Sequence, residues 1–257
     1  MVNTNPKKSK MKKKFFAIVM LCFNLCMSTA IGQTLIDFET GIVSTGYNDV
    51  RIPGDKGTFF SMKDGLNSKT EFFYRLRLNY THKSRHTFSL LYALLQTKSN
   101  GSLSQDLSFE GVLFSAQTEL NGTYKFNSYR LTYRYDIVQK SMFEFGFGIT
   151  AKVRDARIAI SSSSLTSEKT NVGFVPLINF RLLCKMNEKF GLLLDGDALA
   201  APQGRAVDVL VAATYMVSNK IVVRAGYRML EGGADNDIVY NFALFHYASV
   251  GLSYTFR

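Results

Sequence analysis

The chain ends on Ser249-Val250-Gly251-Leu252-Ser253-Tyr254-Thr255-Phe256-Arg257, and this stretch decides the fold. Counted back from Phe256, every second residue is apolar, while the residues between are small or polar. Successive side chains of a β-strand point to opposite faces, so this alternation predicts a strand with one apolar face. The strand would end on an aromatic side chain almost at the chain terminus.

The same alternation recurs throughout the chain. Ten segments are predicted as strands, and most have at least the ~9–11 residues that a tilted strand needs to cross a bilayer. No stretch after residue 33 offers the ~20 apolar residues of a membrane-spanning helix. The segments are about 35–47, 70–82, 86–97, 122–137, 142–156, 171–185, 189–200, 205–217, 220–230 and 240–256.

The connections between these segments alternate between short and long. Four tight turns carry the Asn, Ser and Lys that turns prefer: His82-Lys83-Ser84-Arg85, Val138-Gln139-Lys140-Ser141, Met186-Asn187-Glu188-Lys189 and Val217-Ser218-Asn219-Lys220. The intervening connections, about 48–69, 98–121, 157–170 and 231–239, are longer, except for a short one at 201–204. A soluble sandwich of two sheets has no reason to sort its loops in this way, whereas a membrane barrel does.

Tyrosines on the apolar face support the same interpretation. Tyr80, Tyr135, Tyr215 and Tyr254 each lie near the end of a segment that enters a tight turn or the terminus. Four tyrosines at one height would form an interfacial girdle, where an amphipathic ring sits best. The alternative is that tyrosine is simply a favourable strand residue.

The closing strand resembles that of Gram-negative outer-membrane β-barrels, which commonly end on a C-terminal Phe; here Arg257 follows it. The tract Arg224-Ala225-Gly226-Tyr227-Arg228-Met229-Leu230-Glu231-Gly232-Gly233-Ala234-Asp235 also resembles small outer-membrane barrels of unassigned activity. The resemblance implies an all-β fold, a single antiparallel transmembrane barrel of ten strands, or alternatively eight, with short periplasmic turns and longer extracellular loops. It further implies outer-membrane lipid as the surroundings and recognition by the barrel-assembly machinery through the strand ending at Phe256. It brings no catalytic residues and no cofactor.

The N-terminal segment is predicted to be a cleaved signal peptide. Lys12-Lys13-Lys14 precedes a short apolar run, and small residues follow at Ala30 and Gly32. We expect residues 1–32 to be removed and residues 33–257 to form the barrel domain. Six lysines but no acidic residue would leave with this segment, which about halves the net charge of +11. The remaining charge gives no reason to expect nucleic acid as a partner.

The face opposite the apolar one is charged, and in a barrel it lines the lumen. One interpretation is an ion-paired plug, because an unpaired buried charge is costly. The other is an arginine-rich constriction that selects anions. The predicted bases are Arg75, Arg77, Arg130, Arg134, Lys152, Arg154, Arg181, Arg224 and Arg228, and the predicted acids are Asp37, Glu39, Glu144, Asp195, Asp197 and Asp208.

Two weaker signals concern metal binding and catalysis. Glu231, Asp235 and Asp237 lie in a glycine-containing loop and could offer oxygen ligands to a hard cation, although a solvated acidic turn is the alternative. No other metal site is predicted. His82 and His86 flank a tight turn, on the side away from surface substrates, so no catalytic residue is assigned.

Two strand registers are open. The alternation places His246 toward lipid unless a bulge near Ala248-Ser249 intervenes, and Pro176 suggests a bulge or a strand end. For function, we expect a monomeric, non-enzymatic outer-membrane barrel that acts as a structural or surface-binding protein. The alternatives are a narrow pore and, second, a lipid- or peptide-processing enzyme.

Overall fold

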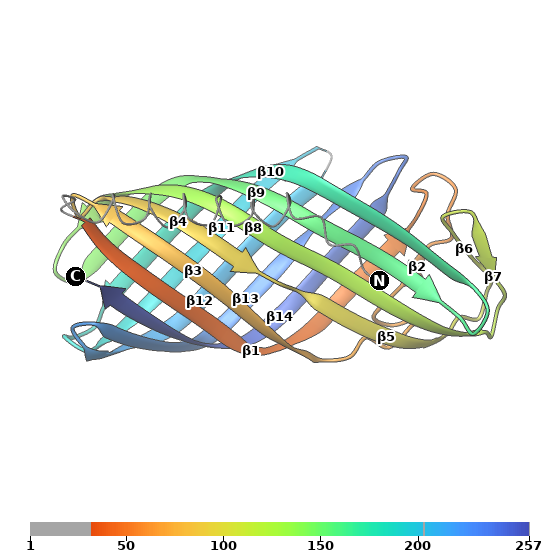
Figure 1. The fold of residues 1–257 in the computed structure, drawn as a ribbon, viewed down its shortest axis with the longest axis horizontal. Coiled ribbons are helices and arrows are strands. Elements are labelled where there is room, and N and C mark those ends of the chain that lie inside the picture. The colour runs from red at the N-terminus through yellow and green to blue at the C-terminus, as the bar shows by residue number, and fades with distance from the viewer. Residues whose placement is uncertain (1–31, 203, 257) are drawn as a thin grey trace, which may run out of the picture. The chain divides into compact units, whose positions relative to one another are not determined.

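The computed structural model describes residues 32–202 and 204–256, and their regular elements are β-strands (Figure 1). The predicted signal peptide and its cleavage site fall on residues that lie almost entirely outside this range. Within the described residues, no helix is long and apolar enough to cross a membrane. The strands are β1 (Gly32–Arg51), β2 (Phe60–Ser61), β3 (Glu71–His82), β4 (His86–Ala93), β5 (Gln96–Ser102), β6 (Leu107–Phe109), β7 (Val112–Phe114), β8 (Glu119–Gln139), β9 (Phe143–Ser161), β10 (Thr166–Lys185), β11 (Phe190–Ala201), β12 (Gly204–Ser218), β13 (Ile221–Asp235) and β14 (Tyr240–Phe256).

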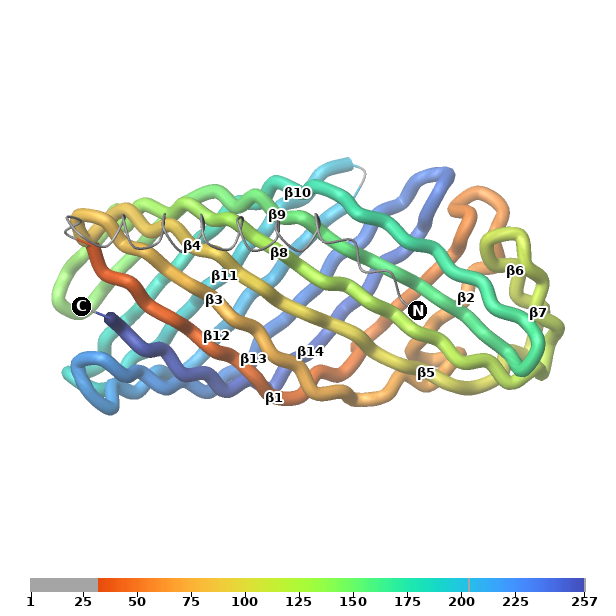
Figure 2. Tube along the Cα trace, viewed as in Figure 1, coloured from red at the N-terminus to blue at the C-terminus, as the bar shows by residue number. Residues whose placement is uncertain are grey.

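Ten strands form the wall of a closed antiparallel barrel (Figure 2). β4 and β5 both pair with β8 and together make one wall strand, β2 adds only a short ladder to β1, and β6 pairs with β7 as a separate hairpin. The barrel closes where β14 pairs with β1, from Thr34 opposite Phe256 to Arg51 opposite Tyr240. The prediction of ten strands, rather than eight, is therefore confirmed.

The connections are sorted between the two ends of the barrel. The four tight turns lie at the end where β1 begins and β14 finishes, which we call the short-turn end. The long-loop end carries residues 52–70, which include β2, and residues 103–118, which include β6 and β7. The predicted loops 157–170 and 231–239 are mostly strand, because β9 and β10 stay paired as far as Ser161 opposite Thr166 and β13 runs to Asp235.

The outside of the wall is apolar. Large side chains such as Phe72, Leu90, Leu131, Ile149 and Val211 are exposed there. Near the short-turn end the predicted tyrosines stand beside other aromatic side chains: the rings of Tyr215 and Phe190 are 4.8 Å apart, as are those of Tyr254 and Phe256. An apolar band with aromatic residues at its edge is the exterior that a membrane barrel needs.

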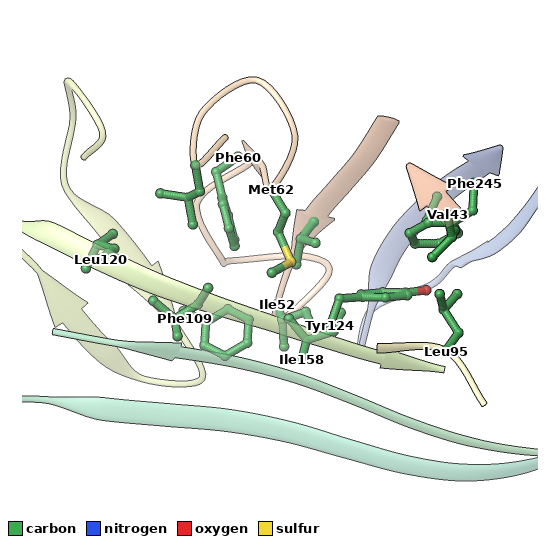
Figure 3. Close-up of a cluster of buried hydrophobic side chains, with 14 of the residues drawn as sticks. Val43, Ile52, Phe60, Met62, Leu95, Phe109, Leu120, Tyr124, Ile158 and Phe245 are labelled. Carbon is green, nitrogen blue, oxygen red and sulfur yellow. The ribbon is translucent and has the colours of Figure 1, made fainter. Parts of the chain in front are cut away.

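The inside of the wall changes character along the barrel axis. Toward the short-turn end it carries ionised side chains, whereas toward the long-loop end it carries a buried apolar cluster (Figure 3). Wall residues such as Tyr124, Ile158 and Phe245 pack there against side chains from the long loops, among them Ile52, Phe60, Met62, Phe109 and Phe114. We call these loop side chains the apolar lid. The long loops therefore fold into the barrel mouth, which the alternation of the strands did not predict.

The two open registers are settled by local contacts. β14 carries no bulge near Ala248, so the plain alternation holds: Phe245 and Tyr247 are buried in the lumen and His246 lies on the outer face. His246 is satisfied there by the Tyr227 hydroxyl, 2.5 Å from its Nδ1. Gly46 of β1 leaves room for the ring, since a Cβ on Gly46 would lie 2.5 Å from His246 Nε2.

Pro176 lies within β10 and marks neither a bulge nor a strand end. Its ladder with β9 is continuous, with Pro176 opposite Ala151. The ladder between β10 and β11 begins only at Ile178, opposite Ala198. Pro176 is thus tolerated because β10 is a free edge on that side, the position where a residue without an N–H does least harm.

Candidate functional site

The candidate site is the charged layer of the lumen. We call it the lumen charge network, and its members point inward from opposite sides of the wall. They are Asp37 and Glu39 on β1, Arg75 and Arg77 on β3, Arg130 on β8, Asp195 and Asp197 on β11, Asp208 on β12, and Arg224 and Arg228 on β13.

Asp208 is the centre of this network. Its Oδ2 accepts from Arg75 at 2.9 Å and from Arg130 at 2.5 Å, and its Oδ1 accepts from Arg228 at 2.5 Å. The Asp208 side chain is 3% exposed, and those of Arg130 and Arg228 are 2% exposed. Charge-assisted bonds of this length are the strong ones, and here they tie β12 to β3, β8 and β13.

Glu39 forms a second centre beside Asp208. Arg228 donates to it from Nε at 2.7 Å and from Nη2 at 2.8 Å, which is the two-pronged geometry that a guanidinium offers a carboxylate. Arg224 donates to Glu39 at 3.1 Å and also pairs with Asp37. The network therefore continues from the barrel centre toward the short-turn end.

Asp197 and Asp195 lie on β11, next to β12, where Asp197 is directly opposite Asp208 in the ladder. Asp197 accepts from Arg130 at 2.6 Å, from the Thr150 hydroxyl at 2.6 Å and from the Asn179 amide at 2.9 Å. Asp195 accepts from Arg77 at 2.6 Å, but its other oxygen has no partner in the described part of the protein. The uncharged partners were missed from the sequence, because Thr150 and Asn179 are ordinary inner-face residues of their strands.

Three of the predicted network residues form separate pairs nearer the short-turn end. Arg134 pairs with Asp136 at 3.1 Å, and Arg181 is 3.8 Å from Glu144, which Lys185 also contacts. Asp136 and Lys185 were not predicted, although each follows a predicted base on the same face. The exposure of Arg181 and Glu144 makes their pair weaker than those around Asp208.

Small residues on the inner face make room for these guanidiniums. A Cβ on Gly251 would lie 2.5 Å from Cζ of Arg224, and one on Gly146 would lie 2.8 Å from Cδ of Arg134. Glycine lets the arginine side chain lie flat against the neighbouring strand. The glycines of the polar face are the sequence signal for this packing.

Lys152 and Arg154 were predicted with the other bases but differ from them. Within the described residues, no carboxylate lies within ion-pair distance of either one. Lys152 is 2% exposed, and its Nζ lies 4.6 Å from the centre of the Phe126 ring. Arg154 donates to the Asn171 side chain at 2.5 Å.

The possible cation loop is not assembled. Glu231 lies within β13, where it accepts from the Tyr47 hydroxyl at 2.6 Å and pairs with Arg205 at 2.8 Å. Asp235 ends β13 and Asp237 lies in the following turn. No group of three or more His, Cys, Asp or Glu side chains in the described residues is arranged to hold a metal ion.

Comparisons with known proteins give a fold but no close relative. No family model and no curated protein sequence matches the chain. Among solved structures, the outer membrane protease OmpT from Escherichia coli is similar over 87% of this chain and 97% of its own, with 12% identity and a TM-score of 0.53. The translocator domain of the autotransporter NalP from Neisseria meningitidis matches over 98% of both chains, with 11% identity and a TM-score of 0.45. Ail of Yersinia pestis, the attachment invasion locus protein, matches over 88% of this chain and 99% of its own, with 12% identity and a TM-score of 0.40.

Proposed function

We propose that this chain, an outer-membrane β-barrel by its closed ten-stranded wall and apolar exterior, is a non-enzymatic envelope protein with a plugged lumen. The short-turn end is then periplasmic and the long-loop end extracellular. The barrel serves as a structural element and as a platform for binding at the cell surface.

The observation that carries this proposal is the burial of Asp208 among three arginines. A conducting lumen keeps its charges hydrated and free to attract ions. Around Asp208 the charges instead satisfy one another across the barrel. Beyond them, toward the cell surface, the apolar lid packs into the mouth and gives a second closure.

An arginine-lined anion pore is the alternative that the same residues suggested. The pairing of the arginines argues against it, because a neighbouring carboxylate cancels most of the positive potential with which a guanidinium would attract an anion. Conductance in a planar bilayer tests the point. The folded protein is expected to give no steady single-channel current, while steady anion-selective current would refute the plug.

An enzymatic role receives no support from the histidines. His82 and His86 lie at the periplasmic end, and His86 Nδ1 is 2.9 Å from the Tyr133 hydroxyl. His246 faces outward against Tyr227. The likeness to a protease rests on fold alone, at 12% identity.

The platform role rests on the long loops. Residues 103–106 begin the second loop, where the Leu103 carbonyl accepts from the Gln117 N–H at 2.8 Å, and Ser104 is exposed. An epitope inserted at Ser104 is expected to be labelled on intact cells, whereas one at Asn187, in a periplasmic turn, is expected to be labelled only after the outer membrane is opened. The reverse pattern would refute the orientation, and with it the platform.

A further inference from the structure

One cavity of the barrel is not explained by the plugged lumen. It measures about 560 Å³ and lies between the lumen charge network and the apolar lid. Its size falls within the ~300–1,000 Å³ of small-molecule sites. Apolar wall residues such as Phe126, Ile158, Leu230 and Phe245 line it.

A gap in the barrel wall opens beside this cavity. The β11–β12 hairpin ends at Ala201 and Gly204, while β8, β9 and β10 run on past it toward the long-loop end (Figure 2). β10 is therefore paired with β11 only from Ile178 to Lys185, and the rest of β10 is a free edge on that side. Residues from both sides of the gap line the cavity, among them Val175 and Pro176 of β10 and Ala206 of β12.

The gap has an upper limit as well as a lower one. Above it, the β6–β7 hairpin is tied to β10, where Lys169 pairs with Glu110 at 2.8 Å and the Ser167 hydroxyl donates to the Phe109 carbonyl at 3.2 Å. Below it, the β11–β12 hairpin closes the wall. We call this gap, between the β6–β7 hairpin and the β11–β12 hairpin, the side window.

The window opens where the apolar band of the outer wall ends, on the side of the long loops. On the outer face of β10, apolar side chains run from Leu182 to Val172, a length similar to the ~9–11 residues that cross a bilayer. Phe174, which lines the cavity, is 67% exposed, and the polar Thr170 and Glu168 follow on the same face. A molecule that enters the window therefore comes from the outer leaflet of the membrane.

Charge defines one end of this molecule. Arg157, Lys169 and Arg205 line the cavity but are each paired with a glutamate. Lys152 and Arg154 also line it and have no carboxylate partner among the described residues, and Arg154 Nε lacks any hydrogen-bond partner there. A buried ammonium with no carboxylate within ion-pair distance is costly, so the cavity is complementary to an anionic group beside Lys152.

We propose that this cavity binds a long-chain fatty acid, with the carboxylate beside Lys152 and the acyl chain along the apolar wall toward the window. The volume accommodates one acyl chain, and the apolar walls suit its methylene groups. The ammonium of Lys152 is a compact charge that suits a single carboxylate. Lys152 holds the headgroup from the inner end, and Arg154 assists from the same strand. This role goes beyond the proposed envelope function, because a plugged barrel needs no ligand.

Saturable binding of radiolabelled palmitate tests the proposal. The folded protein is placed in nanodiscs of zwitterionic phosphatidylcholine, and empty nanodiscs give the partition of palmitate into lipid. We expect one saturable site per barrel. Binding that never exceeds the empty-nanodisc level would overturn the proposal and would leave the conductance result untouched.

Two kinds of variant separate the charge from the volume. Lys152→Met keeps the length of the side chain and is expected to weaken palmitate binding by roughly 10- to 100-fold, because a charge-assisted contact is lost. It is expected to leave the binding of the uncharged alcohol hexadecanol unchanged. Ala156→Trp, which fills the cavity from β9, is expected to abolish binding of both molecules.

Controls keep these outcomes interpretable. Lys189→Met removes a lysine from a periplasmic turn and is expected to bind palmitate like the unmodified protein. Heat-modifiable gel mobility establishes that each variant is folded, and Ala206→Trp, on the other side of the window, replaces Ala156→Trp if that variant does not fold. Unchanged palmitate affinity in Lys152→Met, or in a folded cavity-filling variant, would refute the site.

Discussion

The two halves of the lumen are closed in opposite ways by one and the same wall. In the half toward the short-turn end, wall residues such as Asp208 and Arg130 meet each other directly across the barrel. In the half toward the long-loop end, wall residues such as Tyr124 and Ile158 form an apolar cluster, and side chains such as Phe109 and Phe114 come in from the loops to cover them. The difference shows that alternation along a strand fixes which side chains face inward, but not what fills the space between them.

The two closures also differ in how they respond to damage. An ion pair in low dielectric is strong while complete and costly once one partner is removed. Apolar packing loses stability in proportion to the volume removed, and no charge is left behind. Substitutions in the two halves are therefore expected to give different patterns of stability and conductance.

The largest effect is expected from Asp195→Ala combined with Asp208→Ala. Removing one partner of a buried pair typically costs about 3–5 kcal/mol, and here Arg75, Arg77, Arg130 and Arg228 would lose partners together. Denaturant unfolding in liposomes is expected to shift to clearly lower denaturant concentration. If water hydrates the arginines, the variant would instead keep its stability and show raised anion conductance. Unchanged stability without conductance would contradict both interpretations of the lumen.

A similar but smaller loss is expected from Phe109→Ala in the apolar lid. Phe109 is fully buried, and truncation of a buried Phe costs about 3–5 kcal/mol in a close-packed core. A loop can relax into the space more easily than a wall strand, so we expect the lower end of this range. The same unfolding titration measures it, with Leu113→Ala, which is exposed on the same hairpin, as the control. Equal losses in the two variants would show that the hairpin does not pack into the mouth.

An intermediate effect is expected on the lipid-facing side of the wall. Leu131 is 54% exposed in the middle of β8, and Leu131→Arg is expected to cost about 2–4 kcal/mol near the bilayer midplane. Ile137 is similarly exposed but lies near the short-turn end, so Ile137→Arg is expected to cost about 0–1 kcal/mol. Folding into liposomes compares the two. A cost that does not depend on depth would contradict the position of the membrane belt.

The smallest effect is expected from Glu168→Gln. Its partner Arg157 is 2.6 Å away, but their side chains are 46% and 42% exposed. Exposed pairs are worth about 0–1 kcal/mol and weaken with salt. The variant is expected to unfold within about 0.5 kcal/mol of the unmodified protein, as measured in the same titration. A loss as large as that at Asp208 would show that burial does not set the strength of these pairs.

Much of the wall could be predicted from the sequence, because each strand carries its own period of two. The faces of β3, β8 and β13 follow directly from residues such as Arg75, Arg130 and Arg228. The carboxylate with which each arginine pairs could not be predicted in the same way. Arg75 meets Asp208 only because the sheet closes at a particular width, and that is a property of all ten strands together.

The apolar lid and the side window were missed for different reasons. The lid was signalled by apolar residues such as Phe60 and Phe109 in segments predicted to be exposed loops, but no period identifies a loop that folds inward. The window follows from the short connection after Ala201, which the sequence did indicate. Whether this short connection leaves a gap in the wall depends on how far β9 and β10 extend beyond it, and strand ends are the least certain part of such a prediction.

The pairing of β14 with β1 has a consequence for how the barrel is made. Every other long ladder joins strands that are neighbours along the chain, whereas this one joins Thr34 to Phe256. Pairing these strands costs more loop-closure entropy than any other ladder of the barrel. The contacts that offset this cost can form only after the final residues have been synthesised. Until then the polypeptide carries two unsatisfied strand edges, which neither the hydrocarbon nor the aqueous periplasm tolerates well. A protein that ends without its last strand would therefore remain an open sheet, prone to aggregation, rather than a slightly smaller barrel.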